Sequence, residues 1–360
     1  MSQAEIQKPL FASLIGRSFV HPAFDYAFIG GGLSLLVIAV AVFNPGILPF
    51  FTGEDFRYFI LVSNNAHFAS STVRLYTKPD ARNSMPILKT ALPLVGLAVV
   101  TLCLFRADSV GYNVRAFYFT WSPYHYAAQA YGLSVMYCYR SGCQLTTSNK
   151  RLLWWVCMLP FFSNFVTANG AGLHWLDFAG WLNDPTAISI LSEFKSVMRI
   201  VAFSAVPFLF WRIWRSEANP MPLISALIIF TNGVWWFTLS PPQAFIWATV
   251  FHGVQYLAIV IIFHVKDQLN QPNNRHGIAY HTLLFYGASL ALGYGLFYGF
   301  PRAFVFAGFT PLASVWYTVA VINIHHFIVD AFIWRLKPSG DNRGIVDAGG
   351  TPATPATVTA

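Results

Sequence analysis

The sequence VINIHHFIVDAFIW, residues 321–334, places two adjacent histidines and an aspartate inside an otherwise hydrophobic stretch. Three other apolar stretches carry a histidine in the same way: LVSNNAHFASSTV (61–73), WSPYHYAAQAYG (121–132) and IWATVFHGVQYLAIV (246–260). An ionisable side chain in hydrocarbon costs several kcal/mol by rough estimate, so a residue of this kind usually has a function. Several of them at similar depth indicate one buried polar site.

The composition is typical of a polytopic membrane protein. Of the 360 residues, 56% are hydrophobic and only 10% are charged, whereas about 25% of residues are charged in an average soluble protein. The mean hydropathy of +0.51 agrees with this assignment. The net charge of +8 comes from basic residues in short loops, where they set membrane topology, so we expect no nucleic-acid partner.

Stretches long enough to span a bilayer occur along most of the chain. A transmembrane helix needs about 20 mainly apolar residues, and we find about ten such stretches. They begin near Tyr26, Arg57, Ile87, Tyr112, Leu152, Ser196, Met221, Gln243, Ile278 and Ala303. When the spans are threaded alternately from a cytoplasmic N-terminus, the Lys/Arg-rich loops fall mainly on one side and the acidic loops on the other. This bias predicts that both termini are cytoplasmic.

We therefore expect an all-α, polytopic integral membrane bundle of about ten transmembrane helices. Residues 1–337 would form a single transmembrane domain. Residues 338–360 are rich in Pro, Gly, Thr and Ala, a composition that predicts a disordered cytoplasmic tail.

The histidines of four spans are expected at overlapping depths. At about 1.5 Å per residue, their distances from the next basic residue place them within roughly 10 Å of one another along the membrane normal. Imidazole is the commonest protein metal ligand, so a metal is the natural occupant of such a site. A lone intramembrane histidine is often a hydrogen-bonding residue between helices, but several at matching depth favour a shared site. The candidate metal ligands are His21, His67, His125, His252, His325 and His326.

Polar residues accompany these histidines at helical spacing. His21 and Asp25, and likewise His326 and Asp330, are four residues apart and share a helix face. A carboxylate one turn from an imidazole can orient that ring or bind the metal itself. We assign as supporting residues Asp25, Gln129 and Gln255. We assign as candidate catalytic residues Asp330 and Tyr256.

Four of these segments resemble a known family. HPAFD (21–25), AHF (66–68), FHGVQY (251–256) and HHFIVDAFIWR (325–335) are similar, in order and placement, to the histidine-bearing segments of the Brp/Blh-type β-carotene dioxygenases. These are bacterial polytopic enzymes that cleave carotene to retinal with a non-haem iron held by histidines. The resemblance implies iron as the cofactor, dioxygen as a co-substrate, and a carotenoid or another lipid as the substrate. It also implies a location in the inner (cytoplasmic) membrane of a bacterium.

The chain also departs from that family pattern. Pro22 follows the first histidine where the family has Gly, and Tyr26 follows Asp25 where the family has a second histidine. Tyr256 stands where the late pair of histidines would have its second member, so one ligand is either lost or supplied by His125. The chain is longer than the family by about two spans.

Three classes of function are compatible with the sequence. The first is an iron-dependent oxygenase that takes a lipophilic substrate from the surrounding lipid. The second is an electron-transfer or accessory subunit of a membrane complex that binds haem, copper or zinc; a haem would give a Soret band. The third is a proton-coupled transporter, although no internal inverted repeat is found. The sequence leaves open whether an electron donor or other subunits are required.

Overall fold

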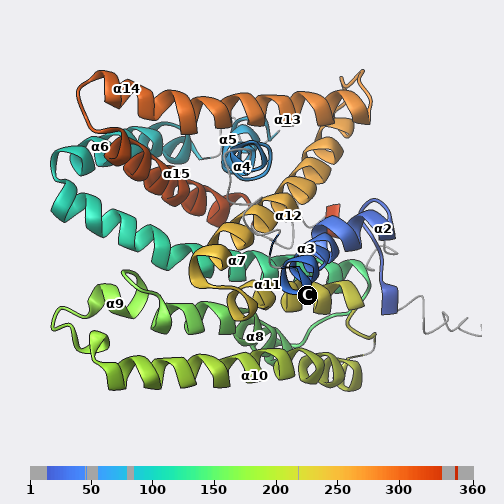
Figure 1. The fold of residues 1–360 in the computed structure, drawn as a ribbon. Coiled ribbons are helices and arrows are strands. Elements are labelled where there is room, and N and C mark those ends of the chain that lie inside the picture. The colour runs from blue at the N-terminus through green and yellow to red at the C-terminus, as the bar shows by residue number, and fades with distance from the viewer. Residues whose placement is uncertain are drawn as a thin grey trace, which may run out of the picture.

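The computed structural model describes residues 14–44, 46, 56–78, 85–217, 219–334 and 345–347, which form helices joined by turns and contain no β-strand (Figure 1). The longer helices are α3 (Gly32–Phe43), α5 (Ala66–Thr77), α6 (Leu92–Phe105), α7 (Tyr112–Arg140), α8 (Thr147–Thr167), α10 (Pro185–Ser216), α11 (Leu223–Thr238), α12 (Pro241–Leu269), α13 (Ile278–Tyr294) and α15 (Pro311–Ile333). The short helices are α2 (Pro22–Phe24), α4 (Phe56–Ile60), α9 (Gly172–Leu176), η7 (Trp181–Asn183) and α14 (Phe300–Phe306). Segments of π-helix adjoin several of them: η1 (Asp25–Ile29), η3 (Leu61–Asn65), η5 (Ile87–Ala91), η6 (Ala107–Gly111) and η8 (Gly295–Gly299).

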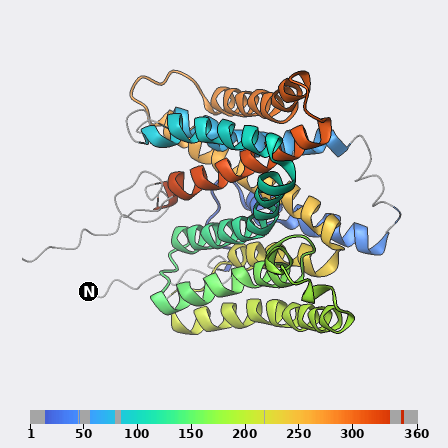
Figure 2. The ribbon, with the colours of Figure 1, turned by 90° about the vertical axis from the view of Figure 1, so that its left-hand side faces the viewer.

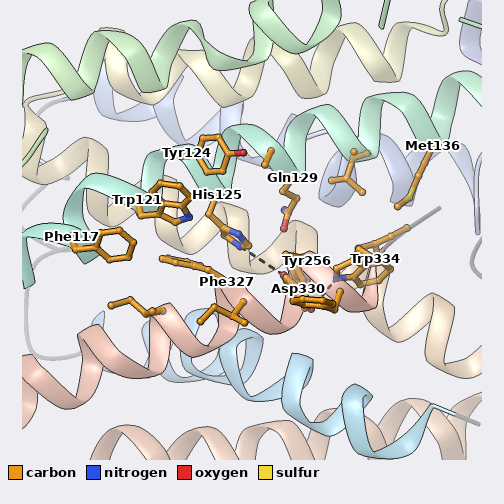
Figure 3. Close-up of a pocket in the computed structure, with 18 residues that line it drawn as sticks. Phe117, Trp121, Tyr124, His125, Gln129, Met136, Tyr256, Phe327, Asp330 and Trp334 are labelled. Atoms are coloured by element: carbon orange, nitrogen blue, oxygen red, sulfur yellow. Dashed lines mark hydrogen bonds and ion pairs between the residues drawn. The ribbon is translucent and has the colours of Figure 1, made fainter. Parts of the chain in front are cut away.

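The helices are stacked in layers, with α13 and α14 at one side and α10 at the other (Figures 1 and 2). The most extensive packing joins α13 to α5, and α8 to both α7 and α10. Helices α5, α7, α12 and α15 lie inside this stack, and α15 packs against both α5 and α7. A cavity lies between α7 and α15 (Figure 3).

Within the described residues, five helical segments are long and apolar enough to cross a membrane: Ile87–Phe105, Pro185–Ser216, Pro241–Leu269, Ile278–Phe306 and Pro311–Ile333. A sixth candidate is a pair bent by 53°, Pro22–Ile29 and Gly32–Phe43. The chain is therefore an all-helical integral membrane protein. Helices occur near nine of the predicted starts, but Ala303, the expected start of the tenth span, lies in the Ile278–Phe306 segment, and the last span is Pro311–Ile333. Helix α7 is less apolar because it buries polar side chains such as Ser122 and Ser134. Ten spans and cytoplasmic termini thus stay a prediction.

Two glycines allow close packing around η3. A Cβ on Gly293 of α13 would come within 2.7 Å of the Asn65 carbonyl oxygen, and a Cβ on Gly253 of α12 within 3.1 Å of the Ser63 carbonyl oxygen. Glycine, which has no Cβ, lets both helices lie directly against this π-helical turn. Because Gly253 follows His252, the second contact also brings His252 close to the helix that carries His67.

The buried side chain of Arg140 connects two distant parts of the chain at one end of the bundle. Its Nε donates to the carbonyl of Ser18 at 2.9 Å, and its guanidinium also donates to the carbonyls of Ile345 and Val346 at 3.4 and 3.3 Å. Both of these apolar side chains are buried in the core cluster that contains Met136. Residues 345–347 are therefore packed rather than disordered, because Ile345 and Val346 bury apolar surface. The other residues of the predicted tail lie outside the described residues.

Candidate metal centre

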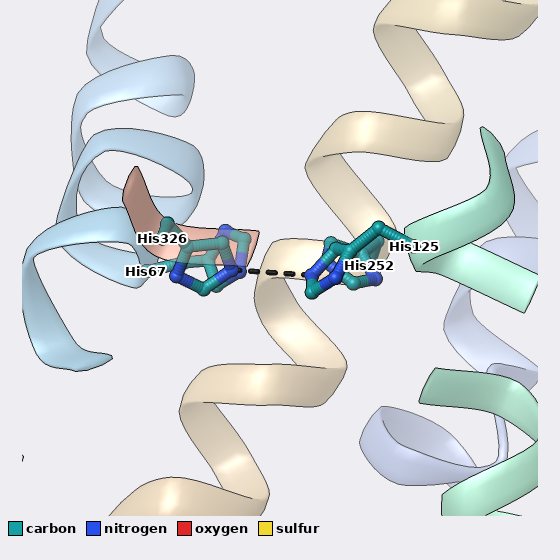
Figure 4. Close-up of side chains that lie close together, drawn as sticks. All are labelled: His67, His125, His252 and His326. Atoms are coloured by element: carbon teal, nitrogen blue, oxygen red, sulfur yellow. Dashed lines mark hydrogen bonds between the residues drawn. The ribbon is translucent and has the colours of Figure 1, made fainter. Parts of the chain in front are cut away.

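Four imidazoles from four helices converge in the interior of the bundle (Figure 4). They belong to His67 of α5, His125 of α7, His252 of α12 and His326 of α15, which we call the histidine cluster. One nitrogen from each lies within 4.8 Å of the other three, and all four residues are buried. The structure thus shows the convergence that their shared depth predicted, whereas metal binding stays a prediction.

Local irregularities in the helices help to bring these rings together. The π-helical turn η3 ends two residues before His67, and Pro123 lies two residues before His125 within α7. A π-turn and an internal proline both change the direction in which the following side chains point. The cluster therefore depends on features that an ideal helix would lack.

The spacing of the nitrogens is compatible with coordination to one ion. The Nε2 atoms of His125 and His326 are 3.2 Å apart. Two nitrogens bound at about 2.1 Å to the same ion lie about 3.0 Å apart at a right angle and about 3.4 Å apart at the tetrahedral angle. All four nitrogens lie within 4.8 Å of one another, so the more distant ones would move closer together on binding one ion.

The contact with Ser71 favours one tautomer of His326. The Ser71 hydroxyl donates its single hydrogen to the carbonyl oxygen of Phe68 at 3.0 Å. Its Oγ also lies 2.9 Å from Nδ1 of His326, and while the hydroxyl hydrogen points to Phe68, Oγ accepts the Nδ1–H of that ring. This assignment leaves a lone pair on Nε2 of His326, the nitrogen that faces the rest of the cluster. A hydrogen bond of this kind orients metal-binding histidines in general.

Asp330 lies one helical turn after His326, and its side chain also faces the histidine cluster. Its Oδ2 is 3.3 Å from Nε2 of His326 and 3.8 Å from Nε2 of His125. Its Oδ1 accepts a 2.6 Å hydrogen bond from the hydroxyl of Tyr256, which accepts a 3.1 Å bond from Nε1 of Trp334. Three electron-rich atoms thus lie close together: Nε2 of His326, Nε2 of His125 and Oδ2 of Asp330. A proton on Nε2 of His125 can satisfy one of the contacts between them, whereas a bound cation satisfies them together.

The remaining two histidines have nitrogens without hydrogen-bond partners. Among the described residues, no partner reaches either ring nitrogen of His67 or Nε2 of His252. The His67 ring packs edge-on against the rings of His326 and Tyr256, with centroids 4.4 and 4.6 Å away. Leaving a buried polar group unpaired costs about 1–3 kcal/mol. A histidine that served to join helices would have a partner, so these nitrogens fit a metal-binding donor set better.

The structure does not bring His21 or His325 to the cluster. His21 is exposed and caps the N-terminus of α2, where its Nδ1 accepts a 3.2 Å hydrogen bond from the backbone N–H of Ala23. His325 is only partly buried beside His326. Consecutive residues on a helix point about 100° apart, so the two neighbours cannot face the same point.

Asp25 is buried away from the histidines. It accepts hydrogen bonds from the backbone N–H groups of Phe19 and Val20 and a 2.7 Å bond from the hydroxyl of Tyr137. It therefore holds the turn before α2, and it does not orient an imidazole as we predicted. The Tyr137–Asp25 pair nevertheless has the same chemistry as the Tyr256–Asp330 pair.

The two predicted glutamines contact backbone rather than imidazole. The side-chain amide of Gln129 donates to the main-chain oxygen of His252 at 3.2 Å, and that of Gln255 donates to the carbonyl of Ile29 at 2.8 Å. These bonds fix α12 relative to α7 and η1. They support the position of His252 without fixing its tautomer.

An elongated cavity of about 620 Å³ adjoins the cluster. Its wall is mostly apolar and comes chiefly from α7 and α15, with Tyr256 and Ile259 from α12 (Figure 3). His125 and Asp330 belong both to this wall and to the surroundings of the cluster. An apolar molecule inside the cavity would therefore lie next to the histidine nitrogens.

Sequence reasoning missed three residues that contact the site. Ser71 follows His67 by four residues and Trp334 follows Asp330 by four, so the helical spacing could have indicated both. The ring of Tyr126 lies 4.4 Å from that of His252, and its hydroxyl bonds Thr249 at 2.7 Å. Nothing in the sequence pattern distinguishes Tyr126 from the other aromatic residues of α7.

Comparison with protein-family models, with curated proteins and with solved structures finds no match to this chain. The class is therefore defined by structure alone. It is an all-helical integral membrane protein in which four buried histidines from separate helices converge beside an apolar cavity.

Proposed function

We propose that this chain is a membrane-embedded, non-haem iron oxygenase that acts on a long apolar substrate. The observation that carries the proposal is that His125 belongs both to the histidine cluster and to the wall of the cavity. An Fe(II) ion held by imidazoles keeps coordination positions for dioxygen and would supply its activation.

The crowding of the ligands favours a bare ion over haem. A haem bound by two axial histidines separates their nitrogens by the plane of a porphyrin. Here all four donor nitrogens lie within 4.8 Å of one another, so two further imidazoles would occupy the space that a porphyrin needs. Imidazole-rich sites also bind zinc and copper, which are the alternatives to iron.

Each residue of the site has a distinct proposed role. The histidine cluster would hold the ion, and Ser71 would keep Nε2 of His326 free for it. Asp330 is the candidate catalytic residue, because it borders both the cluster and the cavity. Tyr256 fixes the Asp330 carboxyl group through the 2.6 Å hydrogen bond. The apolar wall would orient the substrate and exclude water.

The membrane topology and location of the protein are part of the same proposal. Apolar length favours about ten spans, and the loop charges favour cytoplasmic termini. The resemblance to the Brp/Blh-type enzymes implies a bacterial inner membrane, and the substrate would enter from the lipid. The resemblance to the Brp/Blh-type enzymes makes a carotenoid the first candidate substrate. A fatty-acyl or other isoprenoid lipid is the second.

Metal analysis and an optical spectrum of the purified protein test the metal. We expect about one iron per chain and no Soret band. Haem, zinc or copper at full occupancy would reject the non-haem iron assignment, and a protein without bound metal would reject the oxygenase.

Expression in carotene-producing cells tests the substrate. We expect loss of the yellow colour with appearance of retinal, and we expect His67→Ala to abolish both. His281→Ala is the matched control, because His281 is also buried but bonds Asn274 outside the cluster. Unchanged pigment with an iron-loaded protein would reject carotene as the substrate while leaving the oxygenase proposal standing.

A further inference from the structure

The cavity extends past the histidine cluster in both directions. Its lining on α7 runs from Phe117 to Met136, which is about 28 Å along a helix axis. His125 lies between these ends, about 12 Å from the first and about 16 Å from the second, and Figure 3 shows it between them with Asp330 and Tyr256 nearby. The cavity therefore has two arms, which we call the Phe117 arm and the Met136 arm.

Gly132 is the smallest residue that lines the Met136 arm. It follows His125 by seven residues, or two helical turns, and it lies one turn from both Ala128 and Met136, which line the same cavity. Among the described residues, no atom lies within 4 Å of a Cβ built on Gly132. Because residues one turn apart share a face, a side chain at this position would project into the open space of the arm.

No packing contact with the part of the chain that the structure describes explains this glycine. Its backbone is regular α-helix without a positive φ, and open space surrounds its missing side chain. Glycine destabilises a helix interior relative to almost every other residue. A larger residue at position 132 would therefore stabilise the helical conformation of α7, but its side chain would fill the Met136 arm.

We propose that Gly132 determines the length of substrate that the cavity accepts, by keeping the Met136 arm open for a linear, uncharged molecule that occupies both arms. This inference rests on the proposed function, because it takes the cavity as the substrate site. The atoms that meet the histidine cluster are then internal to the substrate and not at its end. A molecule half as long needs only the Phe117 arm.

The test measures binding to the metal-free, detergent-purified protein, so it does not depend on catalysis. The probes are β-carotene and retinol, which is half as long, and the readout is the amount of each retained per chain after purification. We expect Gly132→Leu to lower β-carotene retention at least about tenfold and to leave retinol retention unchanged. Gly287→Leu is the matched control, since Gly287 is an exposed glycine of α13 with equally open surroundings outside the cavity.

The outcomes separate this inference from the proposed function. Equal β-carotene retention by Gly132→Leu and the wild type, loss of both probes in Gly132→Leu, or retention of neither probe by the wild type would overturn the length assignment. The metal content of the same preparations before metal removal reports on folding and on the metal site. A protein that shows the expected length selectivity but binds no metal would reject the oxygenase and keep the inference about Gly132.

Discussion

At the scale of single residues, the hydrogen bond from His326 to Ser71 is the contact that most directly prepares a nitrogen for a metal. Ser71→Ala removes the acceptor for Nδ1–H, so the ring can rotate or change tautomer. We expect metal affinity to fall about 10–100-fold, measured by competition with a chelator. Ser70→Ala is the control, because Ser70 is equally buried but bonds the main-chain oxygen of His67. Equal affinities in the two variants would show that Ser71 does not orient the ligand.

Two buried Tyr–Asp pairs allow a matched comparison of carboxylates. Asp330→Asn keeps the size of the side chain and removes its charge beside the cluster, so we expect metal content or activity to fall about 10–100-fold. Asp25→Asn changes the pair with Tyr137, which lies elsewhere. It should cost about 1.5–3 kcal/mol of stability without changing the metal content of the folded protein. Unaltered metal loading and activity in Asp330→Asn would mean that this carboxylate is incidental.

The sequence predicted part of the site well because depth in a membrane can be read from position along a span. His67, His125, His252 and His326 converge as their depths indicated. The depth of a residue in the membrane does not determine the side of the helix on which it lies. For this reason the predicted metal ligands include His325 as well as His326. Nor does sequence spacing show that His21 caps a helix with its own Nδ1.

At the scale of the elements, apolar length located the helices but not the close contacts between them. Helices occur near the predicted starts except the last, because the final span begins at Pro311 and not near Ala303. The π-turn η3 and the approach of α12 to it through Gly253 have no signature in hydropathy, although they place His252 beside His67. The packing of Ile345 and Val346 was also missed, because composition averages over a tail that contains a few apolar residues.

The ends of α5 and α12 make the proposed topology testable. Gln268 donates to the carbonyl of Thr77 at 3.3 Å, so Lys78 and Lys266 lie at the same end of the bundle. Single cysteines at Lys78 and Arg275 should therefore react with an impermeant thiol reagent from the cytoplasmic side only. A cysteine at Asn183 should react only from the opposite side.

The background in this labelling experiment should be low, because all four native cysteines are buried. Labelling of Lys78→Cys and Arg275→Cys from opposite sides would contradict the threading. Labelling of both from the outside would keep the threading but invert the predicted orientation.

At the scale of the whole molecule, the centre joins four helices from across the sequence, so metal binding and stability should be coupled. A ligand that binds only the folded state stabilises it by about 4 kcal/mol when its free concentration is a thousand times Kd. We expect Fe(II) to raise the midpoint of thermal unfolding of the wild-type protein by several degrees, and a chelator to reverse this shift.

The change in thermal stability caused by His67→Leu tells whether His67 is a metal ligand or a residue that joins helices. Neither ring nitrogen of His67 has a partner among the described residues, so an apolar side chain of similar size removes an unpaired polar group. Such a replacement is neutral or stabilising, and metal-free His67→Leu should unfold at or above the wild-type midpoint. The same variant should lose most of the stabilisation by Fe(II). A residue that joined helices by hydrogen bonds would behave in the opposite way, with a lower midpoint without metal and an undiminished response to it, and that result would reject the metal centre.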